Sequence, residues 1–400
     1  MCKVLVSRQA ILNVPNLRFP EFSGEWMSCQ LGKIASLSKG EGISKDQRSI
    51  NGNPCILYGE LYTTYSTEII DEVISKTNLP EKGLVKSKAN DVIIPASGET
   101  AIDISTARCV TRSDVFLGGD LNIIRLKGQD GKFFSYQLNG VRKKDIAKVA
   151  QGVSIVHLHG SDLATVQVNY PSIGEQQKIS GFLSLIDQRI AIQNRLIEDL
   201  KKLKTALEDT CFYNCGGKQV CLRDILVERG ERSNRNNQYE VLSSTVEGIY
   251  SQREYFKKEI ASADNAGYKV IHLGDIVLSP QNLWMGNINY NDRFSIGIVS
   301  PSYKVFSIKP TFDEQFVASI LKTKRALWKY SLVSEQGASI VRRNLNMEDF
   351  YEISFAIPSL EKQRRIGEGI SSIRDKIRLE QSYLNILNSH KSYLLSKMFI

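Results

Sequence analysis

Few residues in this 400-residue sequence have the types and spacing that catalysis requires. The sequence contains no G-x-x-x-x-G-K-[ST] segment for nucleotide phosphates, no G-x-S-x-G nucleophile turn and no H-E-x-x-H metal-binding helix. His157 and His159 alternate as on one face of a strand, without a pattern of further ligands around them. Cys211, Cys215 and Cys221 lack the paired spacing and the fourth ligand of a zinc site. We therefore predict no catalytic residue and no metal site in this chain.

The charged and polar residues instead favour a nucleic-acid partner. Lys and Arg total 52 against 43 Asp and Glu, and the resulting net charge of +9 attracts polyanions. Basic side chains neutralise phosphates, whereas Arg, Asn and Gln can make paired hydrogen bonds to base edges in the major groove. The alternative is a solvated basic surface without a partner, and any single residue taken alone is more simply interpreted as part of an ordinary polar loop.

The DNA-binding candidates form two groups, one in each half of the sequence. In the first half they are Tyr58, Glu60, Tyr62, Thr63, Ser97, Glu99, Thr100, Arg142, Lys143, Lys144 and Ser154. In the second half they are Arg232, Asn234, Arg235, Gln281, Asn282, Lys324, Arg325, Lys329, Ser339, Arg342 and Arg343. They lie in polar segments that differ between the halves, or close to a Gln-Gly motif that both halves share.

An internal repeat organises the elements that must position these residues. Residues 171–179 resemble residues 358–366 at an offset of 187. Upstream, Gln151-Gly152-Val153-Ser154-Ile155-Val156 matches Gln336-Gly337-Ala338-Ser339-Ile340-Val341, and Asp91–Pro95 resembles Asp275–Pro280. The last pair predicts a buried strand that ends at a proline in each half. The chain is therefore a tandem duplication of a globular unit followed by a long helix.

The two helices carry the heptad spacing of a coiled coil, with apolar residues at alternating steps of four and three. The seam residues are Ile179, Leu183, Ile186, Ile190, Ile197, Leu200 and Leu207 in the first helix, and Ile366, Ile370, Ile373, Ile377, Leu384, Leu387 and Leu394 in the second. Both seams are interrupted at the same two places, by Gln193 and Lys204 or by Glu380 and Lys391. Helices of about 38 residues would be about 57 Å long. Two unrelated amphipathic helices are the alternative, but equal register and shared interruptions argue against it.

The composition limits where the protein acts. No run of 18 apolar residues exists, so no membrane span is predicted, and the first 20 residues lack the apolar core of a signal peptide. Seven irregularly spaced cysteines are typical of reduced thiols. We expect a cytoplasmic protein.

At the level of motifs, the sequence resembles the specificity (S) subunit of type I restriction–modification enzymes. Residues 13–26, followed by Leu31-Gly32-Lys33-Ile34, are similar to the start of many members, and the two Pro-Ser…Gln…Ile helix entries resemble the repeated element of the family. The resemblance covers essentially the full length. It implies an α+β fold with two α/β target-recognition domains separated by two long antiparallel helices. The expected boundaries are 1–170 and 217–357 for the domains and 171–216 and 358–400 for the helices.

The resemblance also implies a function and partners. Each domain would read one half of a bipartite double-stranded DNA site, and two modification (methyltransferase) subunits and the restriction (motor and nuclease) subunits would assemble with the chain. No cofactor is expected in the chain itself, because S-adenosylmethionine, ATP and Mg belong to those partners. Because a stiff helix pair fixes domain separation, it would also fix the spacing of the two half-sites. The alternatives are a DNA methyltransferase or nuclease with an unrecognised active site, and a helical scaffold that does not bind DNA.

Overall fold

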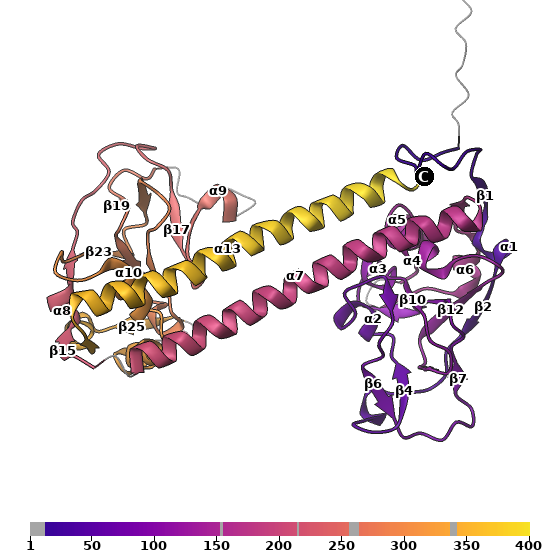
Figure 1. Cartoon of the computed structure of the whole chain (residues 1–400), viewed down its shortest axis with the longest axis horizontal. Coiled ribbons are helices and arrows are strands. Elements are labelled where there is room, and N and C mark those ends of the chain that lie inside the picture. The colour runs from indigo at the N-terminus through magenta and orange to yellow at the C-terminus, as the bar shows by residue number, and fades with distance from the viewer. Residues whose placement is uncertain (1–12, 153–154, 214–215, 256–263, 337–341) are drawn as a thin grey trace, which may run out of the picture. The chain divides into compact units, whose positions relative to one another are not determined.

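The computed structural model describes residues 13–152, 155–213, 216–255, 264–336 and 342–400 (Figure 1). The chain forms two compact units. The first unit comprises Met1–Asn194 and Tyr383–Ile400, and the second comprises Arg195–Ser382. Each unit therefore contains its own sheets and a part of each of the two long helices.

The first unit is built around two five-stranded sheets. One has the order β2 (Ala35–Lys39), β12 (Leu121–Leu126), β8 (Asp91–Pro95), β10 (Arg108–Val110) and β5 (Ile69–Ile70). The other has the order β3 (Arg48–Ser49), β6 (Ser75–Thr77), β4 (Asn53–Ile56), β11 (Phe116–Leu117) and β7 (Val85–Lys86). Every residue of the central strand β8 is buried, as its β-branched sequence predicts. The buried strand therefore fixes the position of the loop that follows Pro95.

Short elements complete the first unit. The two-stranded sheets pair β1 (Met27–Gln30) with β14 (Gln167–Tyr170) and β9 (Ser97–Gly98) with β13 (Val156–His157). The short helices are α1 (Leu31–Ile34), η1 (Lys45–Gln47), α2 (Glu60–Thr63), α3 (Ala101–Ile104), α4 (Gly131–Asn139), α5 (Lys143–Val149) and α6 (Gly160–Thr165).

The second unit repeats the central part of this arrangement. Its four-stranded sheet has the order β16 (Leu226–Glu228), β23 (Lys304–Ile308), β20 (Ile276–Leu278) and β21 (Ile288–Tyr290). Its two-stranded sheets are β15 (Lys218–Cys221) with β26 (Ser354–Ile357), β17 (Leu242–Ser244) with β18 (Ile249–Ser251), β19 (Lys269–His272) with β22 (Ile296–Val299), and β24 (Ser334–Gln336) with β25 (Arg343–Leu345). Strand β20 is fully buried and lies inside its sheet, as β8 does.

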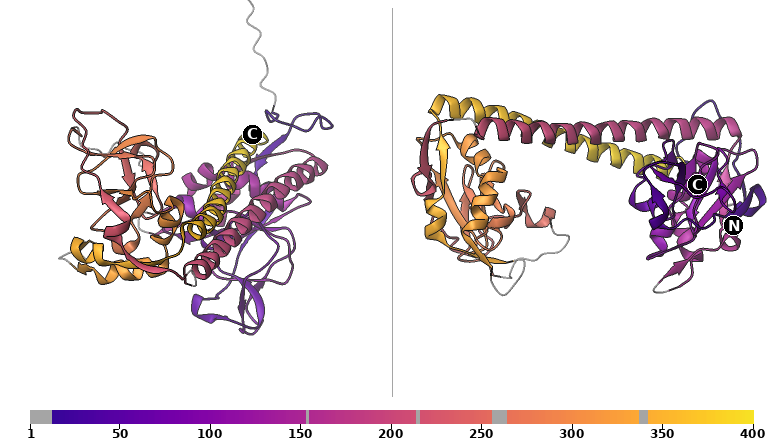
Figure 2. Two further views of the ribbon diagram at one scale, coloured as in Figure 1. Left: turned by 60° about the vertical axis from the view of Figure 1, so that its left-hand side comes forward. Right: turned by 90° about the horizontal axis from the view of Figure 1, so that it is seen from below.

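The helices of the second unit are α8 (Leu222–Ile225), α9 (Gln252–Tyr255), η2 (Leu283–Met285), α10 (Glu314–Ile320), α11 (Lys324–Leu332) and α12 (Met347–Glu352). Its sheets lie on one side of the helix segments that belong to the same unit (Figure 2). Two tandem α/β units, each followed by a long helix, confirm the predicted fold class and the duplication.

The repeated helix entry has a common anchor in both units. The long helices are α7 (Ile173–Tyr213) and α13 (Leu360–Lys397). Gln176 in α7 donates its side-chain amide to Pro171 O at 2.9 Å and accepts a hydrogen bond from Asp130 N at 3.0 Å. Gln363 makes the equivalent bonds to Pro358 O at 2.9 Å and from Asp313 N at 3.0 Å. The glutamine of the motif therefore joins each long helix to the start of α4 or α10, where Asp130 and Asp313 are the N-cap residues.

The helix parts within each unit run antiparallel. In the first unit, Ile179 and Leu183 near the start of α7 share a core with Met398 and Phe399, just after α13. In the second unit, Phe212 near the end of α7 shares a core with Ile370 near the start of α13. Every seam position of both helices is buried or half-buried. No helix among the described residues is both long and apolar enough to cross a membrane.

One of the polar interruptions of the seam forms a buried ionic cluster in the first unit. The Lys391 Nζ atom lies 2.6 Å from Glu68 Oε2 and 2.6 Å from Asp187 Oδ1, and Tyr136 donates its hydroxyl to Asp187 Oδ2 at 2.6 Å. Burial lowers the pKa of Lys391, but the two carboxylates outweigh this and raise it overall. Among the described residues, the equivalent Lys204 pairs with Glu208, one turn away on its own helix.

Candidate DNA interface

The loop that follows the central strand of the first unit is held by backbone pairing. Ser97 and Gly98 pair with His157 and Val156, and Leu158 N donates to Ala96 O at 2.9 Å. The next two candidates, Glu99 and Thr100, are exposed, and the Thr100 hydroxyl caps α3 by accepting from Asp103 N at 3.1 Å. Three of the predicted candidates therefore sit on a rigid edge beside the segment that follows the Gln-Gly motif.

Two histidines lie on the same edge. His157 and His159 are both exposed while Leu158 between them is buried, as their alternation in sequence indicates. Their rings are stacked, with centroids 6.5 Å apart and planes inclined by 12°. They were not among the candidates, although their alternation was the signal that could have identified them. Exposed aromatic rings that are already ordered can contact bases or sugars at a small entropy cost.

The segment around α2 reaches the same edge through Tyr62. The Tyr62 hydroxyl oxygen lies between the loop that contains Gly59 and the loop that contains Gly98. It is 3.9 Å from the position that a Cβ atom would take on either glycine. Burial raises the pKa of Tyr62, and the nearby Tyr58, Asp103 and Glu99 side chains raise it further. The structure therefore brings together the two candidate segments that the sequence presented separately.

A buried arginine fixes the position of α2. Arg108 donates from Nε to Leu61 O at 3.0 Å and from Nη2 to Tyr65 O at 2.8 Å. Because one acceptor lies within this short helix and the other two residues after it, Arg108 positions the Tyr58–Tyr65 segment without being exposed itself.

A groove of about 990 Å³ lies on the other side of α2. Its lining includes the candidates Tyr58, Glu60 and Thr63, and also Lys45 and Arg48. The Glu60 carboxylate is buried; it accepts from Leu57 N at 2.9 Å and from the Ser75 hydroxyl, and pairs with Arg48 at 3.5 Å. Its contacts are therefore mainly internal. Lys45 and Arg48 were missed because they stand outside any basic cluster in the sequence.

The basic cluster of α5 is only partly available to phosphates. Arg142 pairs with Asp145 at 3.3 Å and donates to Ile400 O at 2.9 Å. Lys143 is half-buried and donates to the Thr106 hydroxyl at 3.4 Å. Lys144 is exposed. Of these three candidates, Lys144 has the geometry best suited to a phosphate.

The second unit repeats the edge of the first with different side chains. Gln281 and Asn282 follow β20, and Gln281 O accepts a hydrogen bond from Arg343 N at 3.0 Å. The Arg343 guanidinium stacks on Trp284, with its Cζ atom 4.2 Å from the ring centroid. Gln281 and Arg342 are exposed beside this pair. Again the loop after the central strand meets the segment that follows the Gln-Gly motif.

The remaining candidates of the second unit differ in whether they bond to other groups of the chain or remain exposed. Arg232 donates to Gly267 O at 2.8 Å, and Asn234 N bonds the Gln238 side chain at 2.7 Å, whereas Arg235 is exposed. On α11, Lys324 is exposed, Arg325 lies over the Tyr213 ring at 5.9 Å, and Lys329 donates to Ser354 O. Ser154 and Ser339 fall outside the described residues.

A buried lysine organises the loop that precedes β18. Lys322 donates to Val246 O, to Gly286 O and to Asn289 Oδ1 at 2.9–3.0 Å. Burial lowers the pKa of Lys322 to about 8, with a further contribution from Lys204. This lysine belongs to the basic cluster of the sequence, but its contacts give it an internal role. Across the described ranges, no three His, Cys, Asp or Glu side chains are grouped to hold a metal ion.

Comparisons with known proteins identify the family and the fold. The model of the type I restriction modification DNA specificity domain matches twice, over residues 23–202 and 218–389. A crystal structure of the S subunit of a type I restriction-modification system from M. genitalium is 17% identical, with 97% of this chain and 99% of that chain covered and a TM-score of 0.63. A chain solved in work on complex assembly and conformational transition of the type I R-M system is 13% identical, covers 94% and 97%, and has a TM-score of 0.52. No curated protein matches this chain.

These likenesses establish the class of protein. The family model matches two domains in tandem, and the S subunit structure from M. genitalium shares the fold. The chain belongs to the type I restriction modification DNA specificity family. It is a DNA-recognition subunit, and family membership favours this prediction over the enzyme alternatives.

Proposed function

We propose that the chain reads a bipartite DNA site, with one half-site read by each unit. The observation that carries this proposal is the repeated edge. In both units the loop after the central strand bonds to the segment after the Gln-Gly motif, but one edge presents His157 and Tyr62 and the other presents Gln281 and Arg343. A common frame with unlike side chains suits two readers of unlike sequences, because base edges are distinguished by their donors and acceptors. The proposed recognition domains span 1–170 and 217–357.

The helices 171–216 and 358–400 are proposed as the spacer between the two readers. The seam stripes support this role, because apolar residues at heptad spacing are buried against each other in a stiff pair. Adding one heptad to both helices adds about 10 Å, which corresponds to about three base pairs. We expect such a variant to recognise a longer spacer or to lose binding.

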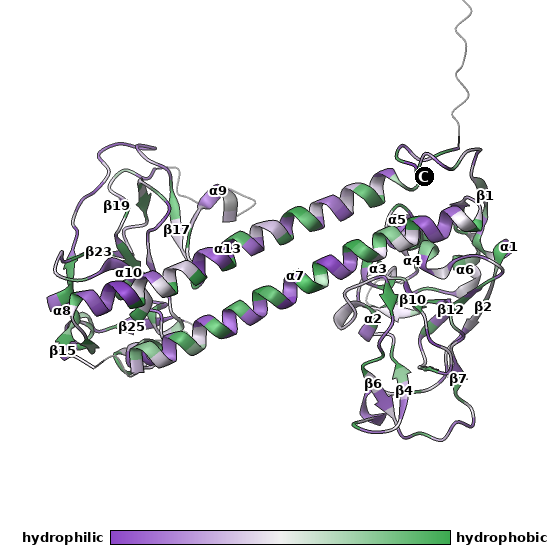
Figure 3. Ribbon diagram, in the orientation of Figure 1, coloured by the Kyte–Doolittle hydropathy of each residue, from purple (hydrophilic) through white to green (hydrophobic). Residues whose placement is uncertain are grey.

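A second apolar stripe on the long helices supports docking of modification subunits. On α7 its exposed residues include Leu185, Ile192, Leu196 and Leu203, and on α13 they include Leu379, Tyr383, Ile386 and Tyr393. Their heptad spacing differs in register from the seam, and apolar turns alternate with polar ones along both helices (Figure 3). Exposed apolar stripes of this kind are suited to helices of another protein. Because Ile192 and Leu196 match Leu379 and Tyr383 at the repeat offset, two equivalent modification subunits are proposed.

The chemistry of the system is assigned to the partners. S-adenosylmethionine would be bound by the modification subunits, and ATP and Mg by the restriction subunits, in a cytoplasmic complex acting on double-stranded DNA. The chain supplies recognition, positions the partners and binds no cofactor of its own in this proposal.

The test exchanges one reader at a time. Residues 1–165 are replaced by the corresponding domain of a relative, and the chain is expressed with its modification subunit in a host that is then analysed by methylated-base sequencing. One half-site should change and the other should remain. Methylation by the chain without its partner, or a change in both half-sites, would refute the proposal.

A further inference from the structure

The same main-chain hydrogen bond closes both proposed recognition edges, and it identifies two equivalent positions. In the first unit, Leu158 N donates to Ala96 O at 2.9 Å. In the second unit, Arg343 N donates to Gln281 O at 3.0 Å. Both acceptors directly follow the proline of the repeated strand motif, and both donors stand at the same distance after the Gln-Gly motif. Leu158 and Arg343 therefore occupy equivalent places in the two units.

The side chains at this position differ in their chemistry. Leu158 is 0% exposed and belongs to the core of the first unit. Arg343 is half-buried, and its Nε atom is buried without a hydrogen-bond partner. No hydrogen bond or ion pair joins its guanidinium to the residues that the structure describes. Because a buried polar group without a partner costs free energy, an arginine at this position indicates a ligand that pairs with it.

A tryptophan ring supports the guanidinium group. The Arg343 Cζ atom lies 4.2 Å from the centroid of the Trp284 ring. Stacking on an aromatic face orients the planar group and leaves its hydrogens free to donate in the plane. Because Nε is buried, Nη1 and Nη2 are the donors that remain for a ligand. The stacked pair therefore presents a two-pronged donor.

Two sets of contacts hold the loop that carries Trp284. Lys322 Nζ donates to Gly286 O at 2.9 Å, directly after η2. Ser244 Oγ donates to Asn287 Oδ1 at 2.8 Å, and Asn287 Nδ2 donates to Ser244 O at 3.0 Å. Ser244 and Asn287 are buried, and satisfied buried polar networks fix a single geometry. The support is therefore rigid, which limits the entropy lost when the stacked pair contacts a ligand.

The chemistry of this pair suits a guanine. In the major groove guanine presents N7 and O6 as two neighbouring acceptors, and adenine, thymine and cytosine do not. A phosphate also accepts two hydrogen bonds from an arginine. However, the exposed neighbour Gln281 is of a residue type that reads base edges, and a rigid planar donor matches the planar edge of a base. These observations favour a base over a phosphate.

We propose that Arg343, supported by Trp284, reads a guanine in the half-site of the second unit through N7 and O6 of that base. Trp284 acts as a positioning residue, because it contacts the guanidinium and sets its plane. The inference rests on the proposed function, since it needs the second unit to read a half-site. Leu158 offers no donor at the equivalent position, so the first unit reads its half-site with other side chains.

The first experiment uses the full chain assembled with its modification subunit. The domain exchange described above assigns one half-site to each unit, and its failure would refute the proposed function itself. Binding is then measured on a library in which both half-sites are randomised. Arg343→Leu introduces the residue of the first unit and should reduce the preference for guanine at one position of the second half-site by at least about fivefold. An unchanged preference at every position of that half-site would overturn this proposal alone.

A modified base distinguishes a guanine contact from a phosphate contact. At the position identified by the library, 7-deazaguanine removes the N7 acceptor and keeps base pairing. It should weaken binding of the unchanged chain at least about fivefold and should not weaken binding of Arg343→Leu further. No effect on the unchanged chain, or an equal effect on both chains, would overturn the proposal. If Arg343→Leu weakens all sequences equally and lowers the salt dependence by about one ion, the ligand is a phosphate and the proposal is wrong.

Three further variants test the support and the charge. Trp284→Leu removes the aromatic face and should reduce the guanine preference, whereas Trp284→Phe keeps a ring and should retain most of it. Arg223→Ala removes one positive charge from the same unit, at a surface pair with Glu352, and should change no base preference. An unchanged preference in the first half-site shows that each variant is folded. A full guanine preference in Trp284→Leu, or a loss in Arg223→Ala, would contradict the assigned roles.

Discussion

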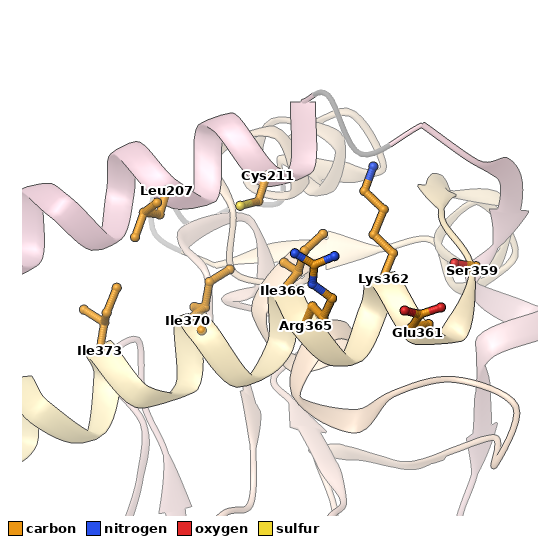
Figure 4. A pocket seen from close by; sticks show the side chains of 10 residues that line it. Leu207, Cys211, Ser359, Glu361, Lys362, Arg365, Ile366, Ile370 and Ile373 are labelled. Carbon is orange, nitrogen blue, oxygen red and sulfur yellow. The ribbon is translucent and has the colours of Figure 1, made fainter.

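The two units differ in what covers the apolar residues between their two helix segments. Both contain a start of one long helix beside an end of the other, and both present apolar residues there. The first unit covers them with residues 17–26, here called the strap, in which Phe19 packs on Phe182 and the buried Trp26 packs on Phe399. The second has a cavity of about 570 Å³ there, lined by apolar residues together with Glu361, Lys362 and Arg365 (Figure 4). The difference teaches that the two units share the helix arrangement but not the segment that covers it.

The interruptions of the seam show the same divergence. Lys391 is 15% exposed and joins Glu68 to Asp187, whereas Lys204 is 27% exposed and has one partner on its own helix. The same residue type at the same heptad position therefore forms a buried ionic cluster in the first unit and a half-exposed ion pair in the second.

The largest effect is expected at the strap. Trp26→Ala removes a buried ring from the first unit and should lower its free energy of unfolding by about 3–5 kcal/mol. Urea denaturation followed by circular dichroism measures this. The control is Trp328→Ala, which removes a ring that is 60% exposed and should cost no more than about 0.5 kcal/mol. Equal costs for the two variants would contradict the role of the strap.

The next effect tests the two lysines. Lys391→Met leaves Glu68 and Asp187 buried without their cation and should cost about 3 kcal/mol, the lower end of the range for breaking a buried pair. Lys204→Met breaks a half-exposed pair within one helix and should cost less than about 1 kcal/mol. The same denaturation experiment compares them. A cost for Lys204→Met as large as that for Lys391→Met would show that the two positions are equivalent after all.

The third prediction tests whether the two proposed recognition edges read their half-sites separately. Because a paired contact to a base provides about 1–3 kcal/mol of discrimination, Gln281→Ala should relax sequence preference in one half-site only. His157→Ala should affect only the other half-site. Methylation of a library of sites by the assembled complex measures both variants. If either change relaxes both half-sites, the edges do not read separately.

The smallest effect is a pH dependence confined to the second unit. The folded pKa of Lys322 is about 8, below its unfolded value, so the unfolded chain binds more protons between these two values. Stability should therefore rise with pH across this window, by roughly 1–2 kcal/mol from pH 7.5 to pH 9.5. The neutral amine keeps two hydrogens for its oxygen acceptors. The measured quantity is the difference in free energy of unfolding between the chain and its Lys322→Met variant, and a difference that stays constant with pH would contradict the prediction.

Much of the fold could be predicted because it depends on patterns of residues that lie close together in the sequence. The heptads predict α7 and α13, and the β-branched runs at Asp91–Pro95 and Asp275–Pro280 predict the central strands. The repeated glutamine marked both helix entries, although its bond to the N-cap of α4 or α10 joins residues about 50 positions apart. No local pattern shows such a partner.

Less of the two proposed recognition edges could be predicted. The loops after the central strands were identified, but their pairing with the Gln-Gly segments depends on the tertiary fold. Arg142 and Lys329 look like phosphate ligands in sequence, yet each donates to a main-chain oxygen. Lys391 looked like an interruption of the seam, and its partner Glu68 lies 323 positions away. The role of a charged side chain depends on partners that are distant in the sequence. The sequence alone does not show which residues those partners are.

The position of Met398 and Phe399 in the core of the first unit has a consequence for biosynthesis. A ribosome completes the second unit, residues 195–382, before it has made the residues that close the first. The half of the protein that is synthesised first is thus the half that finishes folding last. Until then its aromatic core is incomplete, and the apolar side chains that remain exposed favour aggregation of the nascent chain.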